Sequence, residues 1–182
     1  NNDKVELATP ADTQGMIDAA VAAAQKSDVA VVVVGDNEAT SREGWAESHI
    51  GDRTDLNLVG QQQELVDAVL ATGKPTVVIL NNGRPLSIAK IAKDAPAIIE
   101  AWYLGQETGT AIARTLFGDV NPGGKLPVSF ARSVGHLPVY YNYKPTAKRG
   151  YLFTETSELY PFGYGLSYTQ FTYADFKINK AE

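Results

Sequence analysis

The sequence predicts an α/β fold in which a parallel sheet lies between helices on both faces. Continuous runs of β-branched and other apolar residues alternate at least three times with segments of helical periodicity. This alternation is typical of a parallel sheet with right-handed crossovers. The chain has 182 residues, of which 44% are hydrophobic, so it is long enough for one domain with a substantial core.

The first expected element is a helix over residues 14–26, with Asp12 or Thr13 as its cap and with apolar residues at helical spacing on one face. Residues 29–34 (VAVVVV) form the first expected strand, because strands buried on both faces of a parallel sheet have such uninterrupted apolar sequences. A second amphipathic helix is expected over residues 61–70.

Two further strands and two further helices complete the alternating part of the chain. The strands are expected over residues 76–80 (TVVIL) and 97–101 (AIIEA), and the helices over residues 86–92 and 106–117. The carboxyl ends of parallel strands lie at one edge of the sheet, where open α/β folds bind their ligands. Residues that directly follow these strands are therefore the first candidates for a functional site.

The last third of the chain is rich in Gly, Pro and aromatic residues. Residues 126–130 (LPVSF) are expected to form an edge strand, since Pro127 cannot donate a backbone hydrogen bond inside a sheet. Residues 171–178 alternate as a strand does, close to the end of the sequence. A lone strand is not stable, so we expect a domain boundary after residue 170 and the start of a further domain, or a tail, in residues 171–182.

The composition excludes several classes of function. The net charge of -5 leaves no basic stripe, so nucleic acid is not an expected partner. The absence of cysteine excludes thiolate catalysis, disulfides and cysteine-ligated zinc. No run approaches the ~18 apolar residues that span a bilayer, so no membrane partner is expected. The polar start NNDKVELATP resembles no signal peptide and lacks an initiator Met, which suggests a fragment or a processed piece of a larger protein.

The longest connection lies between the first strand and the second helix, over residues 35–60. Loops between a strand and a helix usually have about 2–6 residues, and much longer ones are usually functional or disordered. Trp45 and the apolar residues near its end give this loop something to bury, which disordered segments lack. Its acidic residues are Asp36, Glu38, Glu43, Glu47, Asp52 and Asp55.

Three interpretations of this loop remain open: a metal loop, a solvated structural loop and the carrier of one catalytic carboxylate. The metal interpretation is disfavoured because an EF-hand requires oxygen ligands at alternate positions followed by Gly. Nucleotide binding is disfavoured as well, because no glycine-rich phosphate motif is present. We therefore expect no metal and no cofactor. His49 and His136 are single histidines, for which a hydrogen-bonding role is expected rather than metal ligation.

The carboxylate interpretation rests on spacing. Alternate residues of an extended loop share one side, so Trp45, Glu47 and His49 are expected to face one pocket. A glycosidase needs a carboxyl that protonates the leaving oxygen, and an aromatic or partly dry environment raises its pKa as that task requires. Trp45 either stacks on a sugar or anchors the loop. Arg84 and Glu107 follow other strands at the same edge and are expected to pair with the loop or to contact substrate.

The ordered motifs resemble the second domain of family-three glycoside hydrolases, the β-glucosidase and β-xylosidase group. The matching pieces are DVAVVVVG, GDRTDLNLVGQQQELVDAV, GKPTVVILNNGRPL, AIIEAWYLGQETGTAIARTLFGDVNPGGKLPVSF and YPFGYGLSYTQF. The resemblance implies a three-layer α/β/α sandwich with a mostly parallel sheet of about six strands. It also implies an N-terminal TIM-type barrel as a partner domain and a fibronectin-like domain that begins near residue 171.

In that family the nucleophilic aspartate belongs to the barrel, and the loop of the second domain carries the general acid/base glutamate in many members. The segment SREGWAESHIGDR resembles a branch in which this role falls to the Glu shortly before H-x-G-D-R, here Glu47. Glu43 is the second candidate and Glu38 the third. The substrate-binding candidates are Trp45, His49 and Arg42.

The resemblance implies retaining hydrolysis of terminal β-D-glycosyl residues, with β-glucosides as the expected substrates, by an enzyme of which this chain is an incomplete part. The alternative is a non-catalytic carbohydrate-binding or structural α/β domain. A periplasmic or secreted location is expected, and a homodimer in which the long loop completes a neighbouring site remains open.

Overall fold

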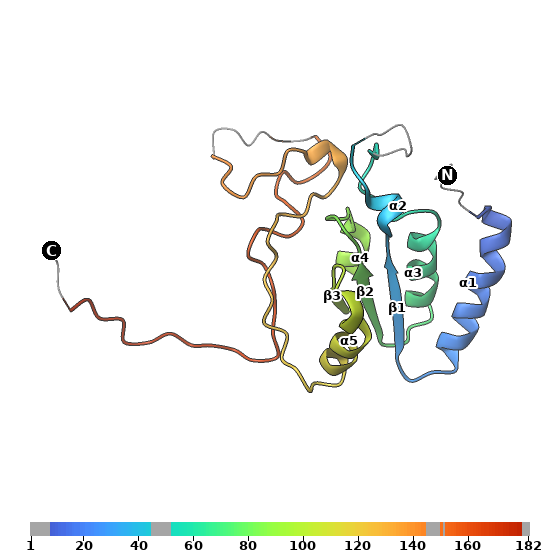
Figure 1. The fold of residues 1–182 in the computed structure, drawn as a ribbon, viewed down its shortest axis with the longest axis horizontal. Coiled ribbons are helices and arrows are strands. Elements are labelled where there is room, and N and C mark those ends of the chain that lie inside the picture. Colours follow the sequence, from blue (N-terminus) through green and yellow to red (C-terminus); the bar gives the residue numbers. More distant parts are fainter. Residues whose placement is uncertain (1–7, 45–51, 145–149, 151, 180–182) are drawn as a thin grey trace.

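The computed structural model describes residues 8–44, 52–144, 150 and 152–179. Its centre is a parallel sheet in the order β1–β2–β3, and Figure 1 shows helices packed beside it. The strands are β1 (Ala30–Gly35), β2 (Thr76–Asn81) and β3 (Ala97–Glu100). The register pairs Val32 with Val78 and Val78 with Ile98, so all three strands end at one edge.

The helices alternate with the strands as expected. They are α1 (Pro10–Gln25), α2 (Glu38–Ser41), α3 (Gln62–Leu70), α4 (Ala89–Asp94) and α5 (Thr108–Leu116), with 3₁₀ turns η1 (Gly105–Glu107) and η2 (Val134–His136). None of the helices in the described ranges is long and apolar enough to cross a membrane. The α/β fold with a parallel sheet is thus confirmed, with three strands in the described residues rather than about six.

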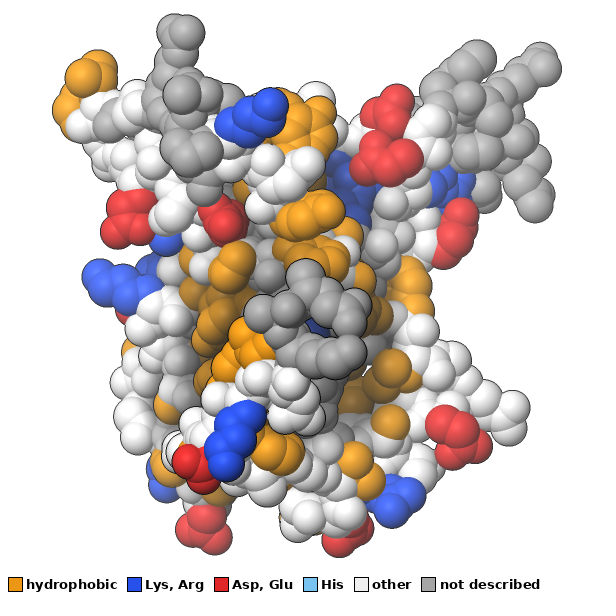
Figure 2. All heavy atoms as spheres, turned by 90° about the vertical axis from the view of Figure 1, so that its left-hand side faces the viewer, with side chains coloured by type: hydrophobic (Ala, Val, Ile, Leu, Met, Phe, Trp, Pro, Cys, Tyr) orange, Lys and Arg blue, Asp and Glu red, His pale blue; other side chains and the backbone are white. Residues whose placement is uncertain are grey.

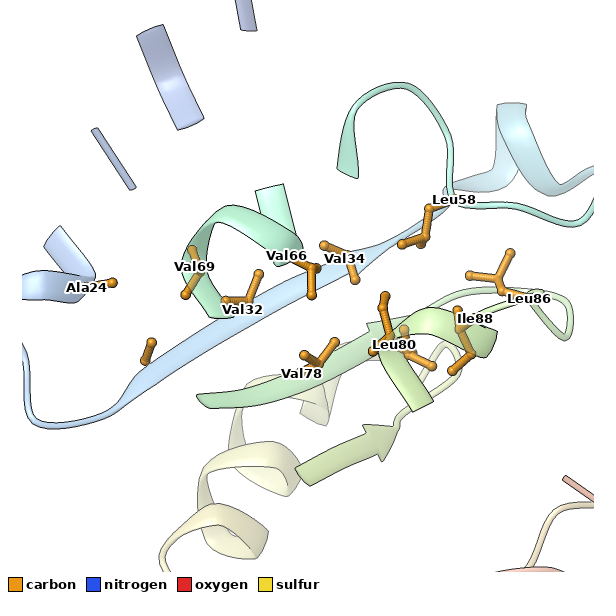
Figure 3. Packing of buried hydrophobic residues seen from close by; sticks show 12 residues of the cluster. Ala24, Val32, Val34, Leu58, Val66, Val69, Val78, Leu80, Leu86 and Ile88 are labelled. Atoms are coloured by element: carbon orange, nitrogen blue, oxygen red, sulfur yellow. The ribbon is translucent and has the colours of Figure 1, made fainter. Parts of the chain in front are cut away.

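The core lies between the sheet and α1, α3 and α4 (Figure 3). Buried residues from these elements include Ala24, Val32, Val34, Val66, Val69, Val78, Leu80 and Ile91. Val66 and Val78 are fully buried. On the opposite face of β1, Val31 and Val33 are 48% and 57% exposed, so the described residues cover that face only in part.

The expected start of the first helix was wrong. Thr9, rather than Asp12 or Thr13, is the cap, and its hydroxyl oxygen accepts a hydrogen bond from the Asp12 N–H at 3.3 Å. Pro10 occupies the first helical position, where a missing N–H has no cost. Expected helix 106–117 begins instead as a 3₁₀ turn, and α5 starts at Thr108.

Two extended segments in the last third of the chain run side by side (Figure 1). Residues 126–130 were expected as an edge strand. They pair antiparallel with residues 159–164 through single hydrogen bonds, such as Phe130 N–H to Tyr160 O at 2.8 Å, but form only an isolated bridge. Phe130 is fully buried and its ring packs on Trp102 with the centroids 5.9 Å apart, which attaches this segment to the sheet. Residues 171–178 form no strand within the described part, and the expectation that they begin a further domain stays a prediction.

Candidate functional site

The three strand ends are joined by polar contacts at the carboxyl edge of the sheet. Asp36 directly follows β1, and its Oδ1 accepts hydrogen bonds from the Gly83 N–H after β2 at 2.9 Å and from the Tyr103 hydroxyl after β3 at 2.6 Å. Ser41 Oγ lies 3.2 Å from the same hydroxyl. This network fixes the direction in which the long loop leaves β1.

Gly35 is required at the exit of β1. Its φ of 148° is rare for residues with a side chain, and a Cβ atom built there would lie 2.0 Å from Asn81 O. Gln62 at the start of α3 holds the same residue, because its Oε1 accepts from Gly35 N–H at 2.6 Å and its Nε2 donates to Gly35 O at 2.8 Å. Gln62 thereby ties the beginning of the loop to the helix that follows the loop.

The first part of the loop is the short helix α2. Asn37 and Thr40 form a reciprocal capping box, with Thr40 N–H donating to Asn37 Oδ1 at 3.1 Å and Asn37 N–H donating to Thr40 Oγ1 at 3.0 Å. Arg42, a candidate for substrate binding, forms an ion pair of 2.8 Å with Glu38 one helical turn earlier. This contact engages its guanidinium within the loop itself.

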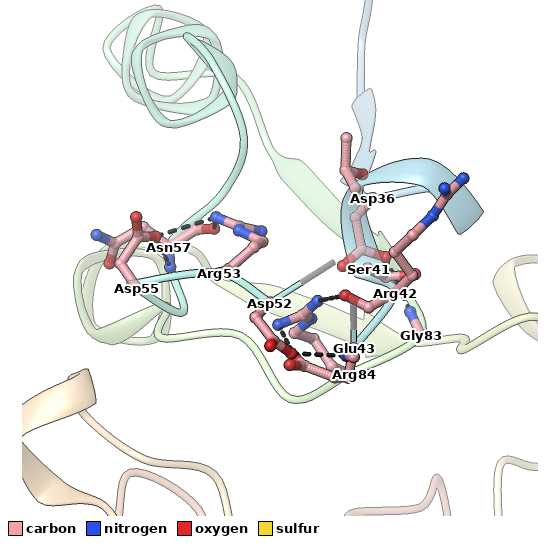
Figure 4. Close-up of polar contacts among 12 residues, drawn as sticks. Asp36, Ser41, Arg42, Glu43, Asp52, Arg53, Asp55, Asn57, Gly83 and Arg84 are labelled. Atoms are coloured by element: carbon pink, nitrogen blue, oxygen red, sulfur yellow. Dashed lines mark hydrogen bonds and ion pairs between the residues drawn. The ribbon is translucent and has the colours of Figure 1, made fainter. Parts of the chain in front are cut away.

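Beyond α2, Gly44 and Asp52, the described residues on either side of 45–51, are in contact. Gly44 N–H donates to Asp52 Oδ1 at 2.6 Å, and Asp52 has a φ of 56°. The guanidinium of Arg84 forms an ion pair with Glu43 and donates to the Arg42 carbonyl at 3.2 Å (Figure 4). We call this group, Arg42–Gly44 with Asp52 and Arg84, the loop neck.

The pKa of Asp52 lies below its usual value, chiefly because its carboxylate accepts the Gly44 N–H, then because of a hydrogen bond with Glu43 and the positive charge of Arg84.

The last part of the loop is held by other contacts. Arg53 pairs with Asp55 at 3.0 Å and donates to Asn57 O at 2.7 Å. Contacts between described residues therefore hold the loop at its beginning, at its neck and at its end.

Glu100, at the end of β3, lies behind this network. Its Oε1 accepts the Trp102 N–H at 3.1 Å, and Trp102 has a φ of 52°, an uncommon conformation for a bulky residue. The pKa of Glu100 is raised to about 7, chiefly by burial and to a lesser extent by the nearby Asp36 carboxylate, against the hydrogen bonds from Trp102 and Asn82. Asn82 is fully buried.

The structure places only some of the residues expected to form the site. Glu47, Trp45 and His49 lie outside the described residues. Glu43 and Arg42 lie at the loop neck. Arg84 pairs with the loop, which is one of the two roles expected for it.

Other outcomes concern histidine, metal binding and residues that the sequence did not indicate. The hydrogen-bonding role of His136 is confirmed, since its Nδ1 lies 2.9 Å from Ser133 Oγ and its Nε2 lies 2.9 Å from Glu155 O. Within the described ranges, no group of three His, Cys, Asp or Glu residues is arranged to hold a metal ion. Sequence reasoning missed Glu100 and Tyr103. Their only signal was an acidic residue at the end of an otherwise apolar strand and a tyrosine that follows it.

Comparison with known proteins adds to this geometry. Residues 4–168 match the Glycosyl hydrolase family 3 C-terminal domain. The chain is 50% identical over 164 residues to a β-xylosidase of Formosa agariphila, covering 88% of this chain and 22% of that protein. It is 46% identical over 181 residues to a periplasmic β-glucosidase of Salmonella typhimurium, covering 93% of this chain and 23% of that protein.

Solved structures agree. A β-glucosidase from Erythrobacter marinus superposes with a TM-score of 0.85 at 53% identity, covering 90% of this chain and 22% of that protein. A β-glucosidase from Listeria innocua in complex with glucose gives a TM-score of 0.73 at 34% identity, covering 91% and 23%. The chain thus spans less than a quarter of the length of these relatives. By its motifs, its parallel sheet and its match over residues 4–168, the chain belongs to the glycosyl hydrolase family 3 C-terminal domain family.

Proposed function

We propose that this chain is the second domain of a retaining exo-β-glycosidase, with β-glucosides as the substrates. The observation that supports this most is the high identity, over 88% and 93% of the chain, to proteins named β-xylosidase and β-glucosidase. An N-terminal TIM-type barrel of the same polypeptide supplies the nucleophilic aspartate. The share of these relatives that the chain covers leaves ample length for such a domain.

Glu47 is the proposed general acid/base. In a retaining mechanism it protonates the departing glycosidic oxygen and then deprotonates the water that attacks the glycosyl-enzyme. The carboxyl groups of the acid/base and of the nucleophile lie about 5–5.5 Å apart in such enzymes. Glu43, the second candidate, contacts Arg84 and Asp52. Because the Arg84 guanidinium engages Glu43 within the loop neck, Glu47 is the preferred candidate and Glu43 the second.

Trp45 and His49 are proposed to contact the sugar beside Glu47. Arg42 is proposed in the same role, with its pairing to Glu38 as the competing interaction. The reaction needs no cofactor, because protonation, nucleophilic attack and water activation are all performed by carboxyl groups.

The complete fold is proposed to be a three-layer sandwich with about six strands. The half-exposed Val31 and Val33 on one face of β1 support this, since a strand of continuous valines is typical of a sheet covered on both faces. A further fibronectin-like domain is proposed to begin near residue 171. Hydrophobic side chains lie over the middle of the face shown in Figure 2, and the exposed aromatic residues of the last third of the chain, such as Tyr141, Phe162 and Tyr168, suit contact with other domains.

A periplasmic or secreted location is proposed, as for the Salmonella relative that is named periplasmic. Neither nucleic acid nor a membrane is a proposed partner. Soluble oligosaccharides with a terminal β-linked sugar suit such a location.

The test is Glu47→Ala in the full-length enzyme, assayed on an aryl β-glucoside with a good leaving group, with and without azide. We expect slow deglycosylation and restored turnover with azide, which yields a β-glycosyl azide. Glu43→Ala is the matched comparison. If Glu43→Ala gives the azide product and Glu47→Ala does not, Glu43 is the acid/base. If neither variant differs from the parent, the domain is non-catalytic and its role is carbohydrate binding or structural support.

A further inference from the structure

Arg84 is a buried cation at a site where two carboxylates of the loop come together. Its side chain is 10% exposed, whereas that of its partner Glu43 is 63% exposed. Glu43 also shares a hydrogen bond with Asp52, and Arg84 acts on Asp52 through its charge. The guanidinium therefore lies beside both carboxylates and beside the Arg42 carbonyl, to which it donates.

The backbone that carries Arg84 is firmly held. Its carbonyl accepts the Asn82 Nδ2–H at 2.6 Å, and Asn82 is fully buried. Leu86 is 1% exposed, and Ser87 N–H donates to Leu56 O at 2.7 Å. Arg84 thus projects from a rigid base that is joined to the core and to the far end of the same loop.

The loop neck needs this cation. Without it, the Glu43 and Asp52 carboxyl groups would face one another with no cation beside them, and the Arg42 carbonyl would lose its donor. Arginine also suits the position because its planar fork donates to a carboxylate and to a carbonyl at the same time, whereas lysine presents a single ammonium group.

We propose that Arg84 is a positioning residue, which joins Arg42 and Glu43 to Asp52 and thereby sets where the acid/base carboxylate between them is presented to substrate. This inference rests on the proposed function of the loop. Arg84 acts through the loop neck and not on the reacting atoms. A small displacement of a general acid lowers the rate strongly, because proton transfer requires hydrogen-bond distance to the leaving oxygen.

The test compares two substrates in the full-length enzyme. Cleavage of 2,4-dinitrophenyl β-glucoside needs little acid assistance, whereas cleavage of phenyl β-glucoside depends on it. For Arg84→Met we expect kcat/KM for the phenyl substrate to fall by about 10²-fold, within the usual contribution of general acid catalysis. For the dinitrophenyl substrate we expect kcat/KM to fall only a few-fold, because its leaving group needs little acid assistance and ground-state binding is preserved. Arg84→Lys is expected to recover the phenyl activity only in part.

Arg132→Met is the matched control, since Arg132 also pairs with a glutamate, Glu155 at 2.7 Å, away from the loop. It should leave the ratio between the two substrates unchanged. Equal losses on both substrates for Arg84→Met, or a ratio like that of Arg132→Met, would overturn the proposal. If Arg84→Met does not fold, Arg84→Lys, which keeps the charge but not the planar fork, must change the same ratio. If the ratio of kcat/KM between the two substrates in that variant equals that of the parent enzyme, the proposal is also overturned.

Glu47→Ala is measured in parallel, so that the positioning role of Arg84 and the acid/base role of Glu47 are tested separately. If Glu47→Ala changes the ratio and Arg84→Met does not, the positioning role is wrong and the acid/base assignment stands. If Arg84→Met changes the ratio and Glu47→Ala does not, Arg84 positions another carboxylate of the loop and the assignment of Glu47 is wrong.

Discussion

Glu100 should make the free energy of unfolding of this protein depend on pH, and the substitution Glu100→Gln should remove that dependence. The carboxyl is held at the end of β3, where burial and the neighbouring Asp36 raise its pKa from 4.5 to about 7. In the unfolded chain the group has its ordinary pKa. Between these two values the folded protein therefore binds a proton that the unfolded protein does not, so stability falls as pH rises.

The magnitude follows from the same values. At 1.36 kcal/mol for each pKa unit, the raised pKa corresponds to at most about 3 kcal/mol of destabilisation. This cost is absent below pH ~4.5, grows through the interval and is complete above pH ~7. Glu100→Gln keeps the shape and carries no charge. We expect it to leave stability nearly unchanged at acidic pH and to raise it by about 2 kcal/mol near pH 8.

The assay is the thermal midpoint of the intact protein and of Glu100→Gln, measured by calorimetry from pH 4.5 to pH 8. The difference between the two midpoints should be near zero at the acidic end and rise by several degrees through pH ~6. Glu64→Gln removes the same charge from an exposed position on α3 and should show no such rise. A difference that is constant with pH, or that has the opposite sign, would refute the reasoning.

Three further predictions concern packing and hydrogen bonds, each measured by denaturant unfolding of the intact protein. Gly35→Ala should destabilise by about 2–4 kcal/mol, since its Cβ would collide with Asn81 O in a backbone conformation that favours glycine. Gln62→Leu should cost about 2 kcal/mol, because Gly35 loses two hydrogen bonds, whereas Gln63→Leu should cost less than about 0.5 kcal/mol. Phe130→Ala should cost about 3–5 kcal/mol, because a fully buried ring is replaced by a cavity. Effects of equal size for Gln62→Leu and Gln63→Leu, or neutral Gly35→Ala and Phe130→Ala variants, would contradict these assignments.

Much of the fold could be predicted because its signals are local. The apolar runs at 29–34, 76–80 and 97–101 overlap the three observed strands within one or two residues. The run 126–130 was less predictable. Its pairing partner lies about thirty residues later along the chain, and Pro127 leaves a gap in the hydrogen bonds.

The candidate site was predictable in its location and less so in its contacts. The length of the 35–60 loop and its acidic residues identified the functional edge of the sheet, and the position of Arg84 after a strand suggested that it pairs with this loop. Nothing in the spacing of the sequence indicated that Arg84 bonds to both Glu43 and the Arg42 carbonyl. Such a pairing depends on which strands are neighbours.

The linear sequence was sufficient for the class of fold, the strand positions, the family resemblance and the loop that follows β1, since each depends on residues close together along the chain. Tertiary structure alone established the loop neck and the environment of Glu100. Both arise where residues 36–52, 82–84 and 100–103 meet at one edge of a parallel sheet. Burial, charge pairing and the raised pKa of Glu100 come from that convergence, because desolvation and Coulomb forces act across space rather than along the chain.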